Sequence, residues 1–572
     1  MAAPTPTSTA VLRSRAMRLA DRAFAAATGL PRSSGDYVVD RGVRVPMRDG
    51  VELVADHYAP AGATARGTVL IRSPYGRSGL GSLVMGRIFA DQGYHVLLQS
   101  CRGTFGSGSA FDPMQHEIDD GHDTVAWLRT QPWFDGRLAT AGGSYLGFVQ
   151  WALLMDPPPE LKTSIVVVGP HDMHQSAWGT GSFSLDDFFG WSEMVAHQED
   201  PGRLRGLYRQ VAAARRLAPG KNGTPLLDAG EKLLLGKAPW YREWLGRPDR
   251  DDPYWTRLKV GAALDKVQVP VLLISGWMDL FLDQSMEQYA HLRARDVDVA
   301  LTVGPWTHVG VIAKGARTVL PEQVAWLDEH LSYPPRPSSV GPAIPRAGLR
   351  PAGRSARVRA YVTGEGGGWR GLADWPPPHT DQALYLHPLG GLAAEAPAPD
   401  EPPSEFTYDP TDPTPSIGGR LLAAGVGGVR DNRGLAARAD VLSFTGAPLS
   451  APLEVVGAPV VELAHRSDNP HCDVFVRICD VAPDGRAVNV SDAFRRLTPG
   501  EHEQDLTLQL DACAHRFAAG HRIQVLVAGG AHPRYARNLG TAEPAAGATT
   551  IAPSHRRIEH GRSLVLLPVV GR

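Results

Sequence analysis

Residues 138–151 read LATAGGSYLGFVQW: a short apolar run, a glycine-flanked serine and a second apolar run. A strand, a sharp turn and a helix in this order are typical of a nucleophile elbow, which exposes a serine hydroxyl at the turn. Glycine suits such a turn because neighbouring side chains would clash with the bent backbone. The match to G-x-S-x-G is imperfect, because Leu146 stands in the last glycine position and Gly147 follows it. The pattern predicts a nucleophile at Ser144, with a plain Gly-Ser turn as the alternative.

Two more strand-like runs each lead to a residue that a serine nucleophile needs. Residues 269–278 (VPVLLISGWM) lead to Asp279, and residues 299–307 (VALTVGPWT) lead to His308. Open parallel sheets present their chemistry at strand ends, and serine, acid, histidine is the chain order of the α/β-hydrolase fold. Taken alone, Asp279 also fits a helix N-cap and His308 an ordinary loop histidine. Together with Ser144, they predict a Ser-His-Asp triad.

Further motifs are spread along most of the chain. They are Met47-Arg48-Asp49-Gly50-Val51, Arg72-Ser73-Pro74-Tyr75, Asp119-Asp120-Gly121-His122-Asp123-Thr124, Gly143-Ser144-Tyr145-Leu146-Gly147, Gly276-Trp277-Met278-Asp279, Gly304-Pro305-Trp306-Thr307-His308, Tyr408-Asp409-Pro410-Thr411-Asp412-Pro413 and Ala439-Asp440-Val441-Leu442. With these motifs the chain resembles the cocaine esterase-like (CocE/NonD) serine hydrolases, relatives of the Xaa-Pro dipeptidyl-peptidases, from about residue 39 onward. The resemblance implies that Ser144 is the nucleophile, His308 the base, Asp279 the orienting acid and Tyr75 an oxyanion donor. The backbone N–H of Tyr145 is expected to be a second oxyanion donor, because it follows the nucleophile.

The hydrophobic rhythm predicts an α/β hydrolase with a mostly parallel, doubly wound sheet. Strands are expected at 68–72, 95–99, 138–141, 164–168, 270–275 and 299–303, with helices at 117–130 and 282–295. We expect an N-terminal extension (1–36), a catalytic domain in two pieces (37–170 and 262–335), an inserted helical cap (171–261) and a C-terminal all-β domain (355–572). The β domain is predicted from period-two alternation, and the family resemblance implies that it is a jelly roll.

Composition excludes several classes of protein. At 572 residues the chain exceeds a single core, and a net charge of −2 indicates no nucleic-acid partner. No apolar stretch approaches the roughly 20 residues of a membrane span, and no secretory signal is recognised. The four cysteines form no CxxC pair, which favours free thiols and a cytoplasmic location. The basic segment 11–19 is interpreted as a helix packed on the body, with a membrane-surface helix as the alternative.

No metal or organic cofactor is expected, because a serine triad needs neither. His171 and His174 have a spacing close to that of metal ligands, but no third ligand is apparent. The glycine-rich stretch 364–369 is interpreted as a turn, because no lysine and no helix follow it. The expected partner is a small-molecule acyl ester or amide substrate, and a homodimer is left open.

Aromatic residues suggest an apolar acyl pocket. The residues expected to contact substrate are Trp277, Trp306, Phe189 and Trp191. Three cap carboxylates, Asp186, Asp187 and Glu193, are candidates for binding a substrate ammonium, but we interpret them as a solvated face.

The expected reaction is hydrolysis of small esters or activated amides through an acyl-enzyme. Three alternatives stay open. The first is an Xaa-Pro dipeptidyl-peptidase or α-amino-acid ester hydrolase. The second is a biosynthetic acyltransferase or cyclase, in which the acyl acceptor is not water. The third is a degenerate, non-catalytic hydrolase that acts as a binding protein.

Overall fold

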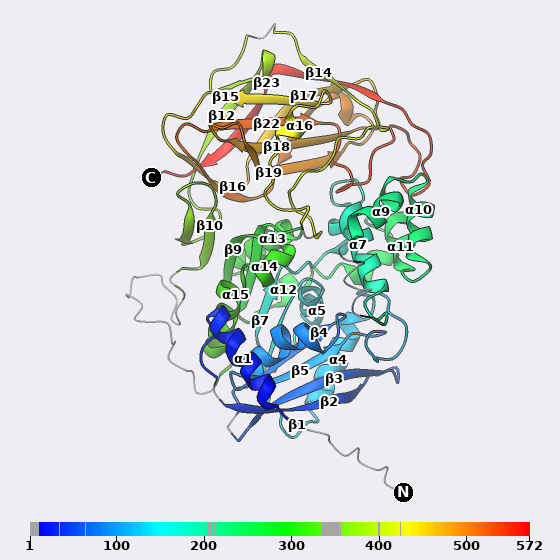
Figure 1. The fold of residues 1–572 in the computed structure, drawn as a ribbon, viewed down its shortest axis with the longest axis vertical. Helices are drawn as coiled ribbons and strands as arrows, with labels where there is room; N and C mark the ends of the chain where they lie inside the picture. The colour runs from blue at the N-terminus through cyan, green and yellow to red at the C-terminus, as the bar shows by residue number, and fades with distance from the viewer. Residues whose placement is uncertain are drawn as a thin grey trace.

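A computed structural model describes residues 11–33, 35–62, 65–202, 209, 212–332, 354, 356–398, 401–423 and 425–571. Figure 1 shows a sheet flanked by helices, a β-rich domain at the opposite end of the long axis, and a group of helices beside the junction of the two. The first ten residues of the expected N-terminal extension, and residues 333–353 around the expected boundary at 335, lie outside the described residues.

The first sheet is mixed and mostly parallel. Its order is β1-β2-β3-β5-β4-β6-β7-β8-β9-β10-β11, where the strands are β1 (Val11–Leu12), β2 (Asp36–Pro46), β3 (Glu52–Ala61), β4 (Thr68–Ser73), β5 (His95–Ser100), β6 (Leu138–Gly143), β7 (Leu161–Val167), β8 (Val271–Met278), β9 (Val299–Thr307), β10 (Val358–Val362) and β11 (Gly368–Leu372). The strands from β5 to β10 pair in parallel. All residues of β4 and β5 are buried, as expected for strands covered on both faces. The predicted α/β-hydrolase fold is confirmed.

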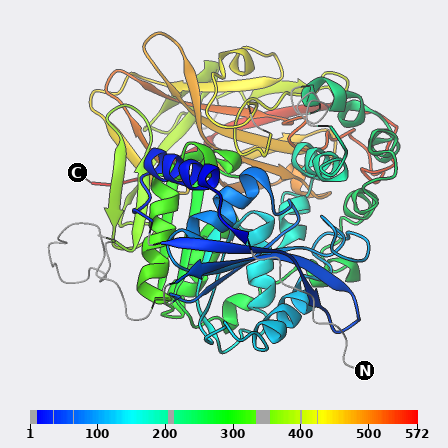
Figure 2. The ribbon, with the colours of Figure 1, turned by 60° about the horizontal axis from the view of Figure 1, so that its bottom comes forward.

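Helices cover this sheet and carry the connections between its strands. They are α1 (Arg15–Thr28), α2 (Gly79–Gly81), the π-helix η1 (Ser82–Arg87), α3 (Ile88–Ala90), α4 (Glu117–Leu128), α5 (Tyr145–Leu153), α12 (Ala263–Lys266), α13 (Leu282–Ala294), α14 (His308–Ala313) and α15 (Ala316–His330). Helix α1 packs against α15, and Figure 2 shows this N-terminal helix lying on the body. None of the helices in the described ranges is both long and apolar enough to cross a bilayer.

The helical insert comprises α6 (Met173–Trp178), α7 (Leu185–Ala196), α9 (Ala213–Asn222), α10 (Leu226–Leu234), α11 (Trp240–Gly246) and the 3-10 helix η2 (Pro253–Leu258). Its aromatic residues pack on one another, for example Phe183 on Phe188 and Phe189 on Tyr241. We call residues 171–261 the cap.

The β domain contains β12 (Thr380–His387), β13 (Gly391–Ala393), β14 (Ser404–Tyr408), β15 (Val441–Gly446), β16 (Leu453–Gly457), β17 (Val460–Ser467), β18 (Asp473–Val481), β19 (Ala487–Arg496), β20 (Asp505–Gln509), β21 (Cys513–Phe517), β22 (Arg522–Ala528) and β23 (Ser554–Val569). Short helices η3 (Pro388–Gly390), α16 (Arg433–Ala436) and η4 (Glu501–Glu503) connect them. The long strand β23 pairs with β12, β14, β16 and β17. The predicted β-rich second domain is confirmed.

Two of the expected domain boundaries differ from the pairing of the strands. Strand β10 pairs in parallel with β9, and β11 then pairs with β10, so residues 358–372 complete the first sheet and do not begin the β domain. Alternation of buried residues fits a strand of either sheet, which is why the pattern alone misassigned this hairpin. At the other end, β1 pairs with β2, so part of the expected N-terminal extension also belongs to the first sheet.

A buried arginine joins the β domain to the catalytic domain. The Arg420 guanidinium donates to both carboxylate oxygens of Asp283 on α13, at 2.7 and 2.8 Å. It also forms an ion pair with Asp511 of the β domain at 2.6 Å. A buried cation with two carboxylate partners fixes the approach of the two domains.

Replacing Arg420 with methionine should lower the free energy of unfolding by about 3–5 kcal/mol, because Asp511 would stay buried without its cation. Urea unfolding followed by tryptophan fluorescence measures the change. As a control, Arg129→Met removes an exposed pair with Glu160, which should cost at most about 1 kcal/mol. An equal decrease in the free energy of unfolding in the two variants would show that Arg420 contributes no more than an exposed ion pair does.

Candidate active site

The backbone turns sharply at Ser144, between the end of β6 and the start of α5. Ser144 has φ 61° and ψ −123°. Residues other than glycine rarely adopt this conformation, and such strained residues cluster at functional sites. Its N–H donates to the carbonyl of Val167 on β7, at 2.9 Å. This strained strand-to-helix turn is the geometry of a nucleophile elbow.

The displaced glycine of the elbow has a packing reason. A Cβ on Gly147 would lie 2.4 Å from the Cα of Gly169, so α5 can approach the segment after β7 only with glycine there. A Cβ on Gly142 would lie 2.5 Å from the Cβ of Leu146, so Leu146 covers the first glycine of the turn. Gly147, one position beyond the last glycine of G-x-S-x-G, is therefore the residue that allows this close contact.

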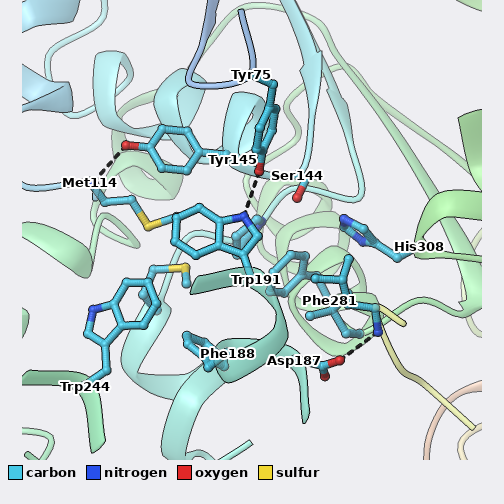
Figure 3. A pocket seen from close by; sticks show the side chains of 14 residues that line it. Tyr75, Met114, Ser144, Tyr145, Asp187, Phe188, Trp191, Trp244, Phe281 and His308 are labelled. Atoms are coloured by element: carbon cyan, nitrogen blue, oxygen red, sulfur yellow. Dashed lines mark hydrogen bonds between the residues drawn. The ribbon is translucent and has the colours of Figure 1, made fainter. Parts of the chain in front are cut away.

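Asp279 and His308 meet at the carboxyl ends of the neighbouring strands β8 and β9. His308 Nδ1 and Asp279 Oδ1 are 2.6 Å apart, and the Ser275 hydroxyl donates to the other carboxylate oxygen at 3.1 Å. The Asp279 side chain is fully buried. The aspartate accepts from Nδ1–H, which leaves the second ring nitrogen of His308 available on the side of the pocket. Figure 3 shows the imidazole pointing toward Ser144.

Tyr75 brings a phenol to the same place from the loop after β4. Its hydroxyl oxygen accepts a hydrogen bond from the indole N–H of Trp191, at 3.0 Å. Burial raises the pKa of Tyr75 to about 12, although the hydrogen bonds to Trp191 and Ser144 oppose the rise. The phenol therefore keeps its proton at neutral pH and can act as a donor.

Tyr145 contributes its backbone and its side chain in different ways. Its N–H is in the first turn of α5, where helix amides have no partner within the helix. Its hydroxyl donates to Glu117 at 2.7 Å and accepts from the Met114 N–H at 2.9 Å. The ring thus supports the pocket wall, while the amide N–H directly follows Ser144 in the chain.

Ser144 and His308 line a mostly apolar pocket with about 440 Å³ of space, part of it open to solvent. The walls are Tyr75, Met114, Tyr145, Pro170, Met173, Asp187, Phe188, Trp191, Trp244, Leu280, Phe281 and Leu422. The cap supplies Phe188, Trp191 and Trp244, and the β domain supplies Leu422. A pocket of this size and composition is typical of small-molecule sites.

Of the four aromatic residues expected to contact substrate, only Trp191 lines the pocket. Trp277 donates its indole N–H to the carbonyl of Tyr361 on β10, and Trp306 packs against Trp369 on β11. These tryptophans are covered by the β10–β11 hairpin that the sequence pattern misassigned. Phe189 follows Phe188 on α7, so its ring points about 100° away and packs on Tyr241 within the cap.

Sequence reasoning also missed several lining residues. Phe281 lies two residues after Asp279, so its position carried a usable signal. Met114 has a positive φ of 69° in a loop, and Leu422 arrives from a loop of the other domain. Neither had a local pattern that ties it to Ser144.

The three cap carboxylates are buried, so their interpretation as a solvated face is wrong. Asp186 pairs with Lys221, and Glu193 pairs with Arg209 and Arg216. Asp187 lines the pocket and has no ion-pair partner within the described ranges. Its Oδ1 accepts the Leu422 N–H at 2.7 Å, as Figure 3 shows. Burial, reinforced by Asp186, raises the pKa of Asp187 to about 7.

The two histidines whose spacing is close to that of metal ligands are each hydrogen-bonded to another residue of the protein. His171 Nδ1 is hydrogen-bonded to Gln288 at 3.1 Å, and His174 Nε2 to the carbonyl of Pro248 at 2.9 Å. In the part of the chain that the structure covers, no three His, Cys, Asp or Glu side chains form a group that could hold a metal ion.

Comparison with protein-family models gives two adjoining matches. Residues 49–310 match the X-Pro dipeptidyl-peptidase (S15 family), and residues 352–564 match the X-Pro dipeptidyl-peptidase C-terminal non-catalytic domain. The second match begins before the β10–β11 hairpin of the first sheet and covers the β domain as far as the middle of β23.

Curated relatives include a cocaine esterase of Rhodococcus sp., 29% identical over 94% of this chain and the whole relative. A candidate serine esterase of Mycobacterium bovis is 26% identical over 87% of this chain and 92% of its own length.

Solved structures with the same fold include an α-amino acid ester hydrolase, with TM-score 0.78 and 24% identity over 95% of this chain and 99% of the other. An aminopeptidase of a Thaumarchaeota archaeon has TM-score 0.77 and 23% identity over 95% and 98%. At these identities the likeness shows the fold alone. From the two family models, which together cover most of the chain, and the full-length cocaine esterase relative, the chain belongs to the CocE/NonD family of hydrolases, which is related to the X-Pro dipeptidyl-peptidases.

Proposed function

We propose that this protein hydrolyses esters, or activated amides, of small acyl groups through Ser144, His308 and Asp279. The observation that carries the proposal is the 2.6 Å contact between His308 and Asp279, placed in the wall of a pocket that also exposes the strained Ser144. The curated relatives named as esterases support the same class of reaction.

In this mechanism the free nitrogen of His308 takes the proton of the Ser144 hydroxyl as its oxygen attacks the acyl carbon. Asp279 holds the imidazole in the required tautomer and stabilises the imidazolium. His308 then returns the proton to the leaving group, which departs and leaves an acyl-enzyme. Water, activated by the same histidine, releases the acid and restores Ser144.

Negative charge develops on the carbonyl oxygen during both halves of the reaction. The Tyr75 phenol and the Tyr145 N–H are the proposed donors to this oxygen. Donors of this kind each contribute about 3–4 kcal/mol of transition-state stabilisation. Tyr75 is suited to the role because burial keeps its pKa near 12, so it remains neutral across the working pH range.

Ser144→Ala should abolish ester hydrolysis and labelling by a fluorophosphonate. Stability should not fall, because the substitution keeps the backbone N–H of residue 144 and the glycine packing that hold the elbow. Mass spectrometry of the labelled wild-type protein should locate the adduct on Ser144. Ser450→Ala, at an exposed serine of the β domain, is the matched control and should keep both ester hydrolysis and fluorophosphonate labelling. A label that persists in Ser144→Ala would disprove the assignment.

Tyr75→Phe should reduce kcat by about 10²–10³-fold with little change in KM, because one oxyanion donor is lost while the ring stays. Steady-state kinetics with p-nitrophenyl acetate measures both constants. A kcat within twofold of the wild type would exclude a donor role for Tyr75.

The pocket supports an apolar or aromatic acyl group as the substrate. Four aromatic side chains, Phe188, Trp191, Trp244 and Phe281, line the pocket together with Ser144. Apolar burial stabilises binding at about 25 cal/mol per Å². Asp187 has a pKa near 7, so its carboxyl is partly neutral at neutral pH and is compatible with a neighbouring apolar acyl group.

A second candidate function is hydrolysis of α-amino acyl substrates, and Asp187 is the specific observation in its favour. It is a pocket carboxyl without a cation partner in the described part of the chain, and a substrate ammonium would supply one. The Asp186 and Glu193 carboxylates lend no such support, because both are already paired with cations.

Methyl phenylacetate and phenylglycine methyl ester differ only by an α-amino group, so their kcat/KM ratio separates the two candidates. We expect the phenylacetate ester to react faster, because an ammonium in this pocket would be poorly compensated while Asp187 is partly neutral. Any contribution of Asp187 to the amino substrate should grow as the pH rises through about 7, where its carboxyl ionises. A kcat/KM that is higher for phenylglycine methyl ester than for methyl phenylacetate, rises with pH and falls in Asp187→Asn would favour the second candidate function.

A further inference from the structure

We infer that Trp191 is a positioning residue for the oxyanion phenol: its indole N–H directs the Tyr75 hydroxyl proton toward the site beside Ser144. The inference rests on the proposed function, in which Tyr75 donates to the oxyanion. It adds that the cap, through helix α7, sets the direction of that donor. Trp191 would therefore affect the rate of the chemical step and not only the fit of the acyl group.

The direction follows from the hydrogen-bonding capacity of the two side chains. An indole nitrogen only donates, whereas a phenol oxygen can donate one hydrogen and also accept. At 3.0 Å from Trp191 Nε1, the Tyr75 oxygen must accept from the indole. Its single hydrogen then has to point elsewhere, and Ser144 lies on the open side of the hydroxyl. An oxyanion formed on Ser144 would occupy the same side.

The indole is held in one orientation by rings on several sides. It stacks on the ring of Tyr145, with centroids 6.3 Å apart and planes inclined by 11°. It also packs against Trp244 and Trp240, at centroid distances of 5.6 and 6.2 Å. Because the ring cannot turn freely among these neighbours, the direction of its N–H bond is set before substrate binds, as preorganised catalysis requires.

The cap also holds the loop that carries Tyr75. Gln198, just after α7, donates from its side-chain amide to the carbonyl of Pro74 at 2.8 Å. Within the loop, the Tyr75 N–H donates to the Ser73 hydroxyl at 3.1 Å. Backbone and phenol are thus both held by hydrogen bonds, one at each end of the residue.

Accepting from the indole also makes the phenol a better donor, because hydrogen bonds in a chain polarise one another. Consistently, the bond from Trp191 opposes the effect of burial on the pKa of Tyr75. Without the indole N–H, the hydroxyl could rotate to other acceptors and its proton would face the oxyanion only part of the time. The loss should be smaller than that of removing the phenol itself.

The competing explanation is that Trp191 only lines the acyl pocket. In that case its truncation would raise KM for bulky acyl groups, leave acetyl esters nearly unaffected, and act independently of Tyr75. A double-mutant cycle separates the two explanations, since only coupled residues give non-additive effects.

The experiment compares wild type, Trp191→Phe, Tyr75→Phe and the double variant on p-nitrophenyl acetate and p-nitrophenyl benzoate. We expect Trp191→Phe to lower kcat about 10-fold for both esters, with KM within about twofold, as for a transition-state interaction. In the Tyr75→Phe background the same change should alter kcat by less than about twofold. Equal effects of Trp191→Phe in both backgrounds, or a change in KM alone for the benzoate ester, would overturn the inference.

Two controls keep the result interpretable. Trp255→Phe removes another indole N–H of the cap, which donates to the Arg247 carbonyl at 3.0 Å and lies outside the pocket lining, so kcat should not change. Replacing Trp191 by 3-benzothienylalanine keeps the ring's shape without the N–H and should reproduce the loss in kcat. A benzothienyl variant with wild-type kcat would overturn the inference even if Trp191→Phe misfolds. Absence of fluorophosphonate labelling at Ser144 in the wild-type protein would instead contradict the proposed function itself.

Discussion

The site depends on the strained turn at Ser144, because every other group takes its position relative to that residue. Close packing of Gly147 on Gly169 pins the start of α5 against the segment after β7, and the Ser144 N–H is tied to Val167. Behind the turn, Tyr145 bonds to Glu117, which forms a buried ion pair with Arg72 at 2.7 Å. A strained residue persists only when its surroundings over-determine it, and these contacts supply that support.

Three parts of the chain converge on this turn. The first sheet provides Ser144, Asp279 and His308, and the cap brings Trp191 and Asp187 over them. The β domain reaches in with one loop, anchored by Arg420 to Asp283 on α13. Two residues after that anchor, Leu422 both lines the pocket and donates its N–H to Asp187. The pocket is therefore incomplete unless both domains are docked.

Local sequence patterns predicted the location of a residue correctly where that residue follows the end of a strand. The predicted strands begin and end within a few residues of β4 to β9, and Ser144, Asp279 and His308 lie as the strand order implies. Patterns failed where the answer depends on a partner far along the chain. Trp277 and Trp306 stand near the triad in sequence, yet the β10–β11 hairpin covers them. Charge alone did not reveal that Asp187 is buried, because the group that bonds to its carboxylate, the Leu422 N–H, comes from a distant loop of the β domain.

The most direct test of this account is a crystal structure of the protein inactivated by a p-nitrophenyl alkylphosphonate, which mimics the tetrahedral intermediate. We predict a covalent bond from Ser144 Oγ to phosphorus, with the phosphoryl oxygen about 2.7–3.1 Å from both the Tyr75 hydroxyl and the Tyr145 nitrogen. The Tyr75 hydroxyl should still accept from Trp191. An adduct on another residue, or a phosphoryl oxygen turned away from Tyr75, would contradict the account.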